Sequence, residues 1–458
     1  KRKQSFSFDD GNESKRLKQA ELASERMIEF WKAALSLMIN PDDKLISLPD
    51  GVNIFGSKSF GSAFIIRECY TDLWKLITED KNYNGWIVTG NPGIGKSMFG
   101  FFLLIYLAKQ GKTVIYEHFL MKDQHKFQPD GCVFKGEFRK ELQDGETWYI
   151  MDTTVPKTLD IMAKKVFIDS PDNEAMKQFQ KESDTASELI MPPWTKEEIM
   201  DSHRNIYSHI SEDMVNKQYD LWGGIPSGRC ANIVNDGKFS CETSHKIYHI
   251  YTTPPNYNNI CMEFASPYAC KKVVELYEQQ HKSELLAFLK ASNYGVWGSV
   301  CGNLFESYAH RVISRGGTFN VHELSQSATE SEEINIEFPK YKLKKYKDIS
   351  EIENNSYCIP HSKTNEGFDS LVPPNKFFSN DCKPCPSNKI KVFKKVKGLM
   401  DGEDICLYFV VPESTHKNFY KVQQILTSDK KITIDRWVNE IKQYALCINL
   451  DMASDTIS

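Results

Sequence analysis

Residues 86 to 97 read Trp86-Ile87-Val88-Thr89-Gly90-Asn91-Pro92-Gly93-Ile94-Gly95-Lys96-Ser97, and this stretch decides the fold of the first half of the chain. A short apolar run ends in the pattern GxxxxGK[ST], and an apolar segment from Met98 to Ala108 follows. The glycines let several backbone N–H groups approach one phosphate, because Cβ atoms would block that approach. This order of strand, loop and helix predicts that a nucleotide phosphate binds at the helix N-terminus. The alternative is an ordinary glycine-rich turn between a strand and a helix.

Two side chains of this loop have distinct expected roles. Lys96 is expected to reach the β- and γ-phosphates, and the Ser97 hydroxyl is expected to ligate Mg²⁺. We expect the cofactors to be ATP and Mg²⁺, although the pattern alone also accommodates GTP. The residues expected to contact the nucleotide are Gly90, Asn91, Pro92, Gly93, Ile94, Gly95, Lys96, Ser97 and Met98.

An acidic residue ends a second apolar run, Thr147-Trp148-Tyr149-Ile150-Met151-Asp152. This pattern predicts a buried strand whose terminal Asp152 holds Mg²⁺ through water. Asp152 is therefore a candidate catalytic residue and, with Ser97, a candidate metal ligand. The alternative is any buried strand that ends in a turn. Thr153 stands where many NTPases of this layout place a catalytic Glu, which argues against fast hydrolysis.

Length and composition restrict the remaining possibilities. The 458 residues are enough for about two or three domains. A net charge of −4 excludes a globally basic protein, so any nucleic-acid site must be local. The longest apolar run is too short for a membrane span, so we expect no membrane partner. The 12 Cys lack the spacing of a disulfide framework, which indicates a reducing working compartment.

The N-terminal residues are polar and basic, with Lys1-Arg2-Lys3 and Lys15-Arg16-Leu17-Lys18 on either side of a spacer. Such clusters are typical of a bipartite nuclear address, and a solvated disordered tail is an equally good interpretation. The sequence does not begin with Met, so we expect any targeting segment to be missing from it. The expected organisation is a basic tail at 1–24, a helical lead-in at 25–80, a nucleotide-binding domain with a helical lid at 81–253, a helical linker at 254–292, a second α/β domain at 293–447 and a tail at 448–458.

Two polar motifs follow in the first half. Asp169-Ser170 ends another predicted strand, and this pair either senses the γ-phosphate or caps the next helix. Thr195 and Glu198 have the spacing of a capping box, which predicts a helix start and the opening of a helical lid.

The second half contains a lysine-rich stretch, Lys340-Tyr341-Lys342-Leu343-Lys344-Lys345-Tyr346-Lys347, and a second group of Lys between positions 389 and 397. Such a stretch predicts either a phosphate-tracking stripe or a solvated edge strand guarded by Lys. Because two such groups occur in one half of an acidic protein, we favour nucleic acid. We also expect helices at 419–426 and at 437–445.

A further constellation has the residue types of a structural zinc site. Cys358-x-x-His361 and Cys382-x-x-Cys385 have suitable ligands and pair spacing. The alternative is a chance match, which is common in a chain with 12 Cys.

Several motifs together resemble the NTPase of Crinkler effectors and of the related retrotransposon-hot-spot proteins. They are the GNPGIGKS loop, the YIMD strand, the SPD turn, the MPPWTKEEI lid start and the WGGIP turn. Further on, NLFESYAH, FDSLVP and LYFVVPE resemble the restriction-endonuclease-like nuclease fused to that NTPase. The resemblance implies an α/β fold: a P-loop NTPase with a parallel sheet and a helical lid, followed by an α/β restriction-endonuclease-like domain. In the WGGIP turn, Arg229 is the nearest match to a nucleotide-sensing Arg, and Ser227 stands where family members often carry Arg.

The resemblance also implies a function. Such proteins are secreted by a fungus or oomycete, enter host cells and act in the host nucleus, where they cause DNA damage or cell death. Carried over, Glu306 and Asp369 are catalytic acids, and Asp369 is also a Mg²⁺ ligand. The next strand should supply an (E/Q)xK pair, but residues 376–381 hold none in register.

Two hypotheses therefore stand side by side. In the first, an ATP-binding NTPase domain controls a nuclease-like domain that binds host DNA and cleaves it with Mg²⁺. In the second, the nuclease fold is dead, and the chain is a nucleotide-switched interaction protein that contacts host partners or forms homo-oligomers without catalysis.

Overall fold

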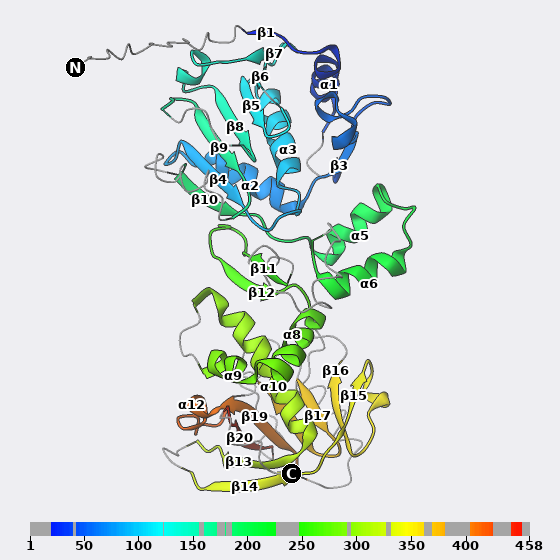
Figure 1. Ribbon diagram of the computed structural model, residues 1–458, viewed down its shortest axis with the longest axis vertical. Coiled ribbons are helices and arrows are strands. Elements are labelled where there is room, and N and C mark those ends of the chain that lie inside the picture. The colour runs from blue at the N-terminus through cyan, green and yellow to red at the C-terminus, as the bar shows by residue number, and fades with distance from the viewer. Residues whose placement is uncertain are drawn as a thin grey trace, which may run out of the picture. The chain divides into compact units, whose positions relative to one another are not determined.

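The computed structural model describes residues 20–39, 43–121, 123–154, 160–171, 179, 186–225, 247–290, 295–326, 331–360, 369–380, 404–424 and 441–450. The chain divides into two compact units, Lys1–Ser266 and Pro267–Ser458. Both units combine helices with a large sheet, so the α/β class predicted from the sequence is confirmed (Figure 1). The basic tail at 1–18 lies outside the described residues.

Among the described residues, the first unit is built around an eight-stranded sheet with the order β1-β7-β6-β5-β8-β9-β4-β10. The strands β5, β8, β9, β4 and β10 are mutually parallel neighbours. Their bounds are Val114–His118 (β5), Trp148–Asp152 (β8), Lys164–Ile168 (β9), Gly85–Thr89 (β4) and Ala186–Ile190 (β10). Parallel strands end at the same edge of a sheet, so Thr89, Asp152 and Ile168 lie along one edge.

The predicted parallel sheet is present over these five strands, and the other three strands pair antiparallel, so the sheet is mixed. β6 (Gln124–Phe127) pairs antiparallel with β5 and with β7 (Val133–Gly136), and β1 (Glu21–Leu22) pairs antiparallel with β7. The β5–β6 and β6–β7 connections are too short for a parallel crossover, which needs about a dozen residues or more. Gly131, with φ of +90°, closes the tight turn between β6 and β7.

The helix after the central strand and the lead-in elements share one core. α3 (Lys96–Lys109) is buried over most of its surface, and α1 (Glu25–Ser36) and α2 (Glu68–Glu79) pack into the same apolar cluster. Alternate residues of the strands face this cluster, while the others face a second cluster on the opposite side of the sheet. The sheet is therefore covered by apolar side chains on both faces.

Further strands and helices of this unit are β2 (Leu45–Ser47), β3 (Ala63–Ile65), α5 (Lys196–Asn205), α6 (Glu212–Trp222), β11 (Tyr248–Tyr251) and β12 (Cys261–Phe264). The β11–β12 hairpin contacts the predicted phosphate loop, residues 90–97. The predicted capping box is present at the start of α5, since Thr195 and Glu198 exchange side-chain and backbone hydrogen bonds. Single turns of 3-10 helix occur in this unit at Ile54–Gly56, Lys58–Phe60 and Glu141–Gln143, and in the second unit at Gly295–Trp297 and Ile349–Glu351.

In the described parts of the second unit, a sheet has the order β14-β13-β20-β19-β18-β17-β16-β15. Its strands are β13 (Gly317–Glu323), β14 (Glu333–Phe338), β15 (Lys342–Tyr346), β16 (Ser356–Pro360), β17 (Ser370–Val372), β18 (Lys376–Ser379), β19 (Cys406–Pro412) and β20 (Lys442–Ile448). The helices are α8 (Pro267–Gln280), α9 (Lys282–Lys290), α10 (Gly298–Arg315) and α12 (Glu413–His416). No helix in the described ranges is both long and apolar enough to cross a membrane.

The expected C-terminal helices are wrong where the structure describes them. Residues 419–424 form no helix, and residues 442–448 form strand β20 between β13 and β19. A central strand is apolar on both faces, so its sequence reads as a continuous apolar run that also suits a helix. Pairing with two neighbouring strands decides the conformation here.

Candidate functional site

The glycines of the phosphate loop are required by close packing. Gly90 has φ of +144°, and a Cβ there would lie 2.5 Å from the Met191 carbonyl oxygen. Gly95 has φ of +100°, and its Cβ would lie 2.7 Å from the Tyr70 hydroxyl. Gly93, with φ of +79°, is exposed. The loop is therefore held against β10 and α2, and L side chains do not fit at its ends.

Asn91 joins this loop to the β11–β12 hairpin. Its side-chain amide donates to the Ile250 carbonyl oxygen at 3.0 Å, and its side-chain oxygen accepts from the Ile250 N–H at 3.1 Å. The Asn91 side chain thus pairs with β11 as a neighbouring strand residue would. Ile94 is fully buried, whereas Pro92 and Met98 are half-buried.

Lys96 is a buried cation with three donated hydrogen bonds. Its Nζ donates to the carbonyl oxygens of Gly90 and Asn91 at 2.8 and 2.9 Å, and to Ser170 Oγ at 3.3 Å. Within the described part of the chain it makes no ion pair. Burial lowers the pKa of the Lys96 ammonium group to about 8, although Asp169 and Asp152 favour its charged form. A buried cation held by neutral oxygens is an electrostatic environment suited to an anion.

Ser97 and Asp152 lie together at the edge of the sheet. Ser97 Oγ donates to Asp152 Oδ1 at 3.0 Å, although 55 residues separate the two in sequence. Burial raises the pKa of Asp152, and the surrounding donors oppose that shift. A hydroxyl and a carboxylate are the hard oxygen donors that Mg²⁺ binds beside a nucleotide phosphate, so this pair fits the ion.

Three further side chains surround the Asp152 carboxylate. Tyr116 OH donates to Oδ2 at 2.9 Å, and Thr153 Oγ1 donates to Oδ1 at 2.9 Å. His118 Nε2 lies 3.7 Å from Oδ2. Thr153 has φ of +54°, which is an uncommon conformation for a β-branched residue. Sequence analysis identified Thr153 only as the residue in place of Glu, and it did not identify Tyr116 or His118.

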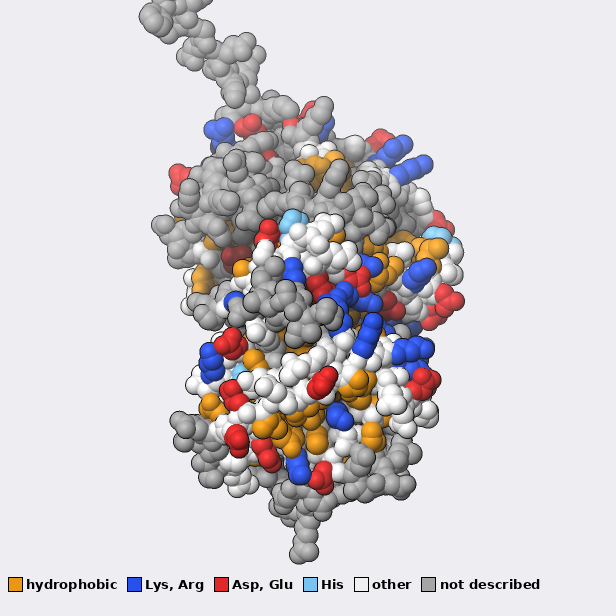
Figure 2. All heavy atoms as spheres, turned by 60° about the horizontal axis from the view of Figure 1, so that its bottom comes forward, with side chains coloured by type: hydrophobic (Ala, Val, Ile, Leu, Met, Phe, Trp, Pro, Cys, Tyr) orange, Lys and Arg blue, Asp and Glu red, His pale blue; other side chains and the backbone are white. Residues whose placement is uncertain are grey.

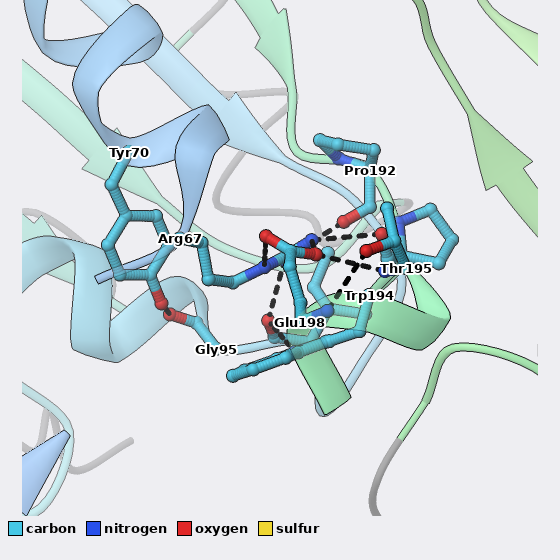
Figure 3. A network of polar contacts seen from close by, with 9 residues as sticks. Arg67, Tyr70, Gly95, Pro192, Trp194, Thr195 and Glu198 are labelled. Atoms are coloured by element: carbon cyan, nitrogen blue, oxygen red, sulfur yellow. Dashed lines mark hydrogen bonds and ion pairs between the residues drawn. The ribbon is translucent and has the colours of Figure 1, made fainter. Parts of the chain in front are cut away.

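Arg67 is the largest polar feature that sequence analysis missed. Its guanidinium is buried, and its five N–H groups donate to the carbonyl oxygens of Ile94, Pro192 and Pro193 and to both carboxylate oxygens of Glu198. Figure 3 shows this side chain between the phosphate loop and the start of α5. The only sequence signal was a lone Arg at the end of an apolar run, Phe64-Ile65-Ile66-Arg67.

Trp194 strengthens the same junction. Its Nε1 donates to the Ile94 carbonyl oxygen at 2.8 Å, and the Arg67 guanidinium carbon lies 4.8 Å from the centroid of its ring. Tyr70 OH donates to the Gly95 carbonyl oxygen at 2.7 Å. The phosphate loop is therefore connected by hydrogen bonds both to α2 and to the first residues of the α5–α6 segment.

In the second unit, Glu306 and Asp369 lie near a buried tyrosine. Burial raises the pKa of the Tyr357 hydroxyl, and the charges of Asp369 and Glu306 raise it further. Tyr357 OH accepts from Ser370 Oγ at 2.6 Å and lies 2.9 Å from His310 Nδ1. The structure thus places Glu306 on α10 and Asp369 directly before β17, and both charges act on the Tyr357 hydroxyl.

The described residues do not assemble a metal site in this unit. No group of three or more His, Cys, Asp or Glu side chains in the described ranges is arranged to hold a metal ion. Asp369 Oδ2 accepts from the Asn380 backbone N–H at 2.6 Å, and His310 Nε2 lies 3.7 Å from Glu306 Oε1. Asp369 and Glu306 therefore each have a polar neighbour, and the predicted Mg²⁺ role of Asp369 stays a prediction.

Several other predicted residues lie outside the described residues. They are Arg229, Ser227, His361, Cys382, Cys385 and the Lys group between 389 and 397. Of the zinc candidates only Cys358 is described; it is fully buried in the core of the second unit.

The first lysine-rich stretch forms β15, which is an edge strand of its sheet. Lys344 pairs with Glu353, and no ion pair is made by Lys342 or Lys345 among the described residues. On the face shown in Figure 2, basic and acidic side chains are interspersed. The edge position suits both predicted interpretations, a guarded strand edge and a phosphate-tracking stripe.

Two curated relatives share part of this sequence. The chain is 25% identical over 275 residues to Crinkler effector protein 16 of Phytophthora infestans, which covers 52% of this chain and 43% of the relative. It is 26% identical over 275 residues to Crinkler effector protein 15 of the same organism, which covers 52% and 44%. The matched part spans less than half the length of each relative. No protein-family model matches the chain. The two matches support a Crinkler-like relationship and suggest an effector-type function.

Proposed function

We propose that the first unit binds ATP with Mg²⁺ at residues 90–98. The observation that carries this proposal is the hydrogen bond between Ser97 Oγ and Asp152 Oδ1, which lie 3.0 Å apart. This contact lies at the N-terminus of α3, whose first residue is the buried Lys96. Lys96 would bind phosphate oxygens, and Ser97 and Asp152 would hold Mg²⁺, which supplies charge neutralisation of the phosphates.

The strand order supports this proposal. β4 leads into the phosphate loop, and β8 ends at Asp152. In the sheet these two strands are separated by β9. Ligands of open α/β sheets bind beyond the carboxyl ends of the strands, at the point where the chain connects non-adjacent strands. Lys96, Asp152 and Asp169 converge at that edge, and the two acids favour the charged form of the lysine.

The test is nucleotide binding by isothermal calorimetry. Lys96→Ala should abolish ATP binding in the presence of Mg²⁺, because it removes the buried cation. The matched control is Lys112→Ala, which removes a lysine that lies beyond the other end of α3 and pairs with Glu146. Unchanged ATP affinity in Lys96→Ala would refute the site.

For the whole protein, we propose a Crinkler-type secreted effector that acts in the nucleus of the host cell. The support is the sequence match to two Crinkler effectors and the two basic clusters at the N-terminus. A reporter fusion expressed in host cells tests the nuclear address. Nuclear accumulation that persists when Lys15, Arg16 and Lys18 are replaced by Ala would contradict the role of that cluster.

The second unit is proposed to be nuclease-like and to bind host DNA. Its strands β16, β17 and β18 are sequential antiparallel neighbours, and β19 then pairs parallel with β18. The charges of Asp369, before β17, and Glu306, on α10, both raise the pKa of Tyr357. Plasmid nicking with Mg²⁺, compared between the wild type and Asp369→Ala, tests whether this unit cleaves. Nicking that is unchanged in the variant would show that Asp369 has no role in DNA cleavage.

A second candidate function is a non-catalytic interaction module that responds to nucleotide. The observation in its favour is that β18 (Lys376–Ser379) carries no acidic residue or Gln. DNA binding without nicking, measured by fluorescence anisotropy, would support a binding module. Dimerisation that depends on ATP, measured by light scattering, would support a switched interaction protein.

A further inference from the structure

We infer that Tyr116 and His118 of β5 are positioning residues for Asp152, and that they determine how strongly Mg²⁺ enhances nucleotide binding. This inference rests on the proposed function, because it concerns the same site. Neither residue is expected to contact the nucleotide. Both act through the carboxylate that would hold the metal ion.

The strand register places these side chains beside Asp152. β5 and β8 are parallel, and His118 pairs with Asp152 in the register. Tyr116 and His118 are two positions apart, so their side chains lie on the same face of β5. Tyr116 OH donates to Oδ2 at 2.9 Å, and His118 Nε2 lies 3.7 Å from the same oxygen. Asp152 Oδ2 thus contacts the side chains of β5, while Asp152 Oδ1 accepts from Ser97 Oγ, 3.0 Å away.

The hydrogen bonds of His118 determine which nitrogen carries the proton. Nδ1 accepts from the Leu120 backbone N–H at 3.1 Å. A neutral imidazole that accepts at Nδ1 carries its proton on Nε2. The Nε2–H group therefore lies on the side of Asp152, and the ring adds a second positive dipole next to Oδ2.

Packing prevents both side chains from leaving this position. An added Cβ on Gly100 would lie 2.5 Å from the Tyr116 hydroxyl, which shows how closely α3 covers it. The Phe60 ring packs edge-on against His118, with centroids 5.2 Å apart. Both residues are almost completely buried. The packing thus holds both side chains next to Asp152 Oδ2.

Outer-shell partners of metal ligands are general determinants of metal affinity, and their loss typically weakens it about 10- to 100-fold. Here the partners act on a carboxylate that has no neighbouring Glu, since Thr153 follows it. The orientation of the Asp152 carboxylate then determines how strongly Mg²⁺ enhances nucleotide binding.

The experiment compares the affinity for a fluorescent ATP analogue in Mg²⁺ with that in EDTA, on the same preparations. We expect Tyr116→Phe and His118→Ala to lose about 10-fold of the Mg²⁺ enhancement, while the affinity in EDTA stays unchanged. His118→Gln should retain much of the enhancement, because its side-chain amide can still donate. His125→Gln is the control, since His125 is also buried, on the adjacent strand β6, and contacts Asp123 instead.

The outcomes separate this inference from the proposed function. No binding of the analogue by the wild type in either buffer overturns the proposed function, and this inference with it. Binding by the wild type, with an unchanged ratio of the two affinities in Tyr116→Phe and His118→Ala, overturns this inference alone. Equal losses in both buffers also contradict it, because they indicate a general structural role. A variant that folds only partly still reports a dissociation constant, since inactive protein lowers the amplitude of the titration and leaves its midpoint in place.

Discussion

The Arg67 guanidinium donates to both carboxylate oxygens of Glu198, at 3.0 Å from Nε and 2.9 Å from Nη2, although 131 residues separate the two in sequence. Glu198 also closes the capping box of α5 through the Thr195 N–H. The Glu198 carboxylate therefore caps the N-terminus of α5 and also pairs with a buried cation next to the phosphate loop. This relationship connects the α5–α6 segment to the proposed nucleotide site.

Replacing Arg67 should destabilise the first unit strongly. Arg67→Met leaves a largely buried carboxylate without its partner, and it removes the donors from three carbonyl groups. The expected loss is about 3–5 kcal/mol of the free energy of unfolding, measured by chemical denaturation. Arg67→Lys should recover only part of it, because an ammonium group cannot donate in the planar fork that Glu198 accepts.

The control for that prediction is an exposed ion pair that involves Asp201 of α5, the helix that contains Glu198. Lys44 Nζ lies 3.0 Å from Asp201 Oδ2, and the Lys44 side chain is largely in solvent. Lys44→Met should leave the denaturation curve unchanged, because exposed pairs contribute little. An Arg67→Met variant as stable as Lys44→Met would contradict the structural role of Arg67.

Gly224 should not accept even a methyl group. A Cβ on this residue would overlap the carbonyl oxygen of Trp194, and the Trp194 N–H donates to the Gly224 carbonyl oxygen at 2.8 Å. Gly224→Ala should lower the free energy of unfolding by about 1–3 kcal/mol, as overpacking does.

Gly302 is the matched case in which replacing glycine by alanine is expected to raise the stability. It lies on α10, and an added Cβ would meet nothing within 4 Å. Gly302→Ala should stabilise the second unit by about 0.5–1 kcal/mol, because alanine loses less backbone entropy in a helix. Thermal unfolding of the two variants should therefore shift in opposite directions.

Acid should destabilise the second unit through His416. Burial lowers the pKa of this histidine from 6.5, and the neighbouring His322 lowers it further, whereas Glu333 and Glu413 and the Ala445 carbonyl group oppose the shift. Below pH 6.5 the unfolded chain binds a proton at this position before the folded protein does. The contribution of neutral His416 to the free energy of unfolding is therefore fully present above pH 6.5 and is lost as the pH falls toward the folded-state pKa.

The measurement is the free energy of unfolding at about pH 7.5 and about pH 5.5, on either side of an ordinary histidine pKa. His416→Gln should lose less stability over this interval than the wild type. His281→Gln, which changes a half-exposed histidine on the surface, should behave as the wild type does. Identical losses in His416→Gln and the wild type would contradict this prediction.

Cys69 should be chemically inert in the folded protein. Burial raises the pKa of its thiol to about 12, even though the Arg67 charge opposes the shift. Because the thiolate is the reactive species, iodoacetamide at about pH 8 should leave Cys69 unmodified. Cys132 is partly exposed and should react under the same conditions, and denaturant should make both react. Mass spectrometry of the digested protein gives the modified fraction of each.

Local patterns were sufficient for the phosphate loop, because its chemistry depends on consecutive residues. Gly90, Gly95 and Lys96 lie within one short loop of the chain, and the capping box at Thr195 and Glu198 spans a single helical turn. Such features follow from backbone geometry and from hydrogen bonds over a few residues. Their positions could therefore be predicted from the sequence without knowledge of the fold.

Tertiary structure alone decided which distant groups meet. Asn91 pairs with Ile250, and Arg67 pairs with Glu198, across separations of 159 and 131 residues. Residues 442–448 became a strand because β13 and β19 lie on either side of them. Hydrogen bonds between distant segments have no periodic signature in the sequence, since their partners are determined by strand order and packing, which many different local patterns can satisfy.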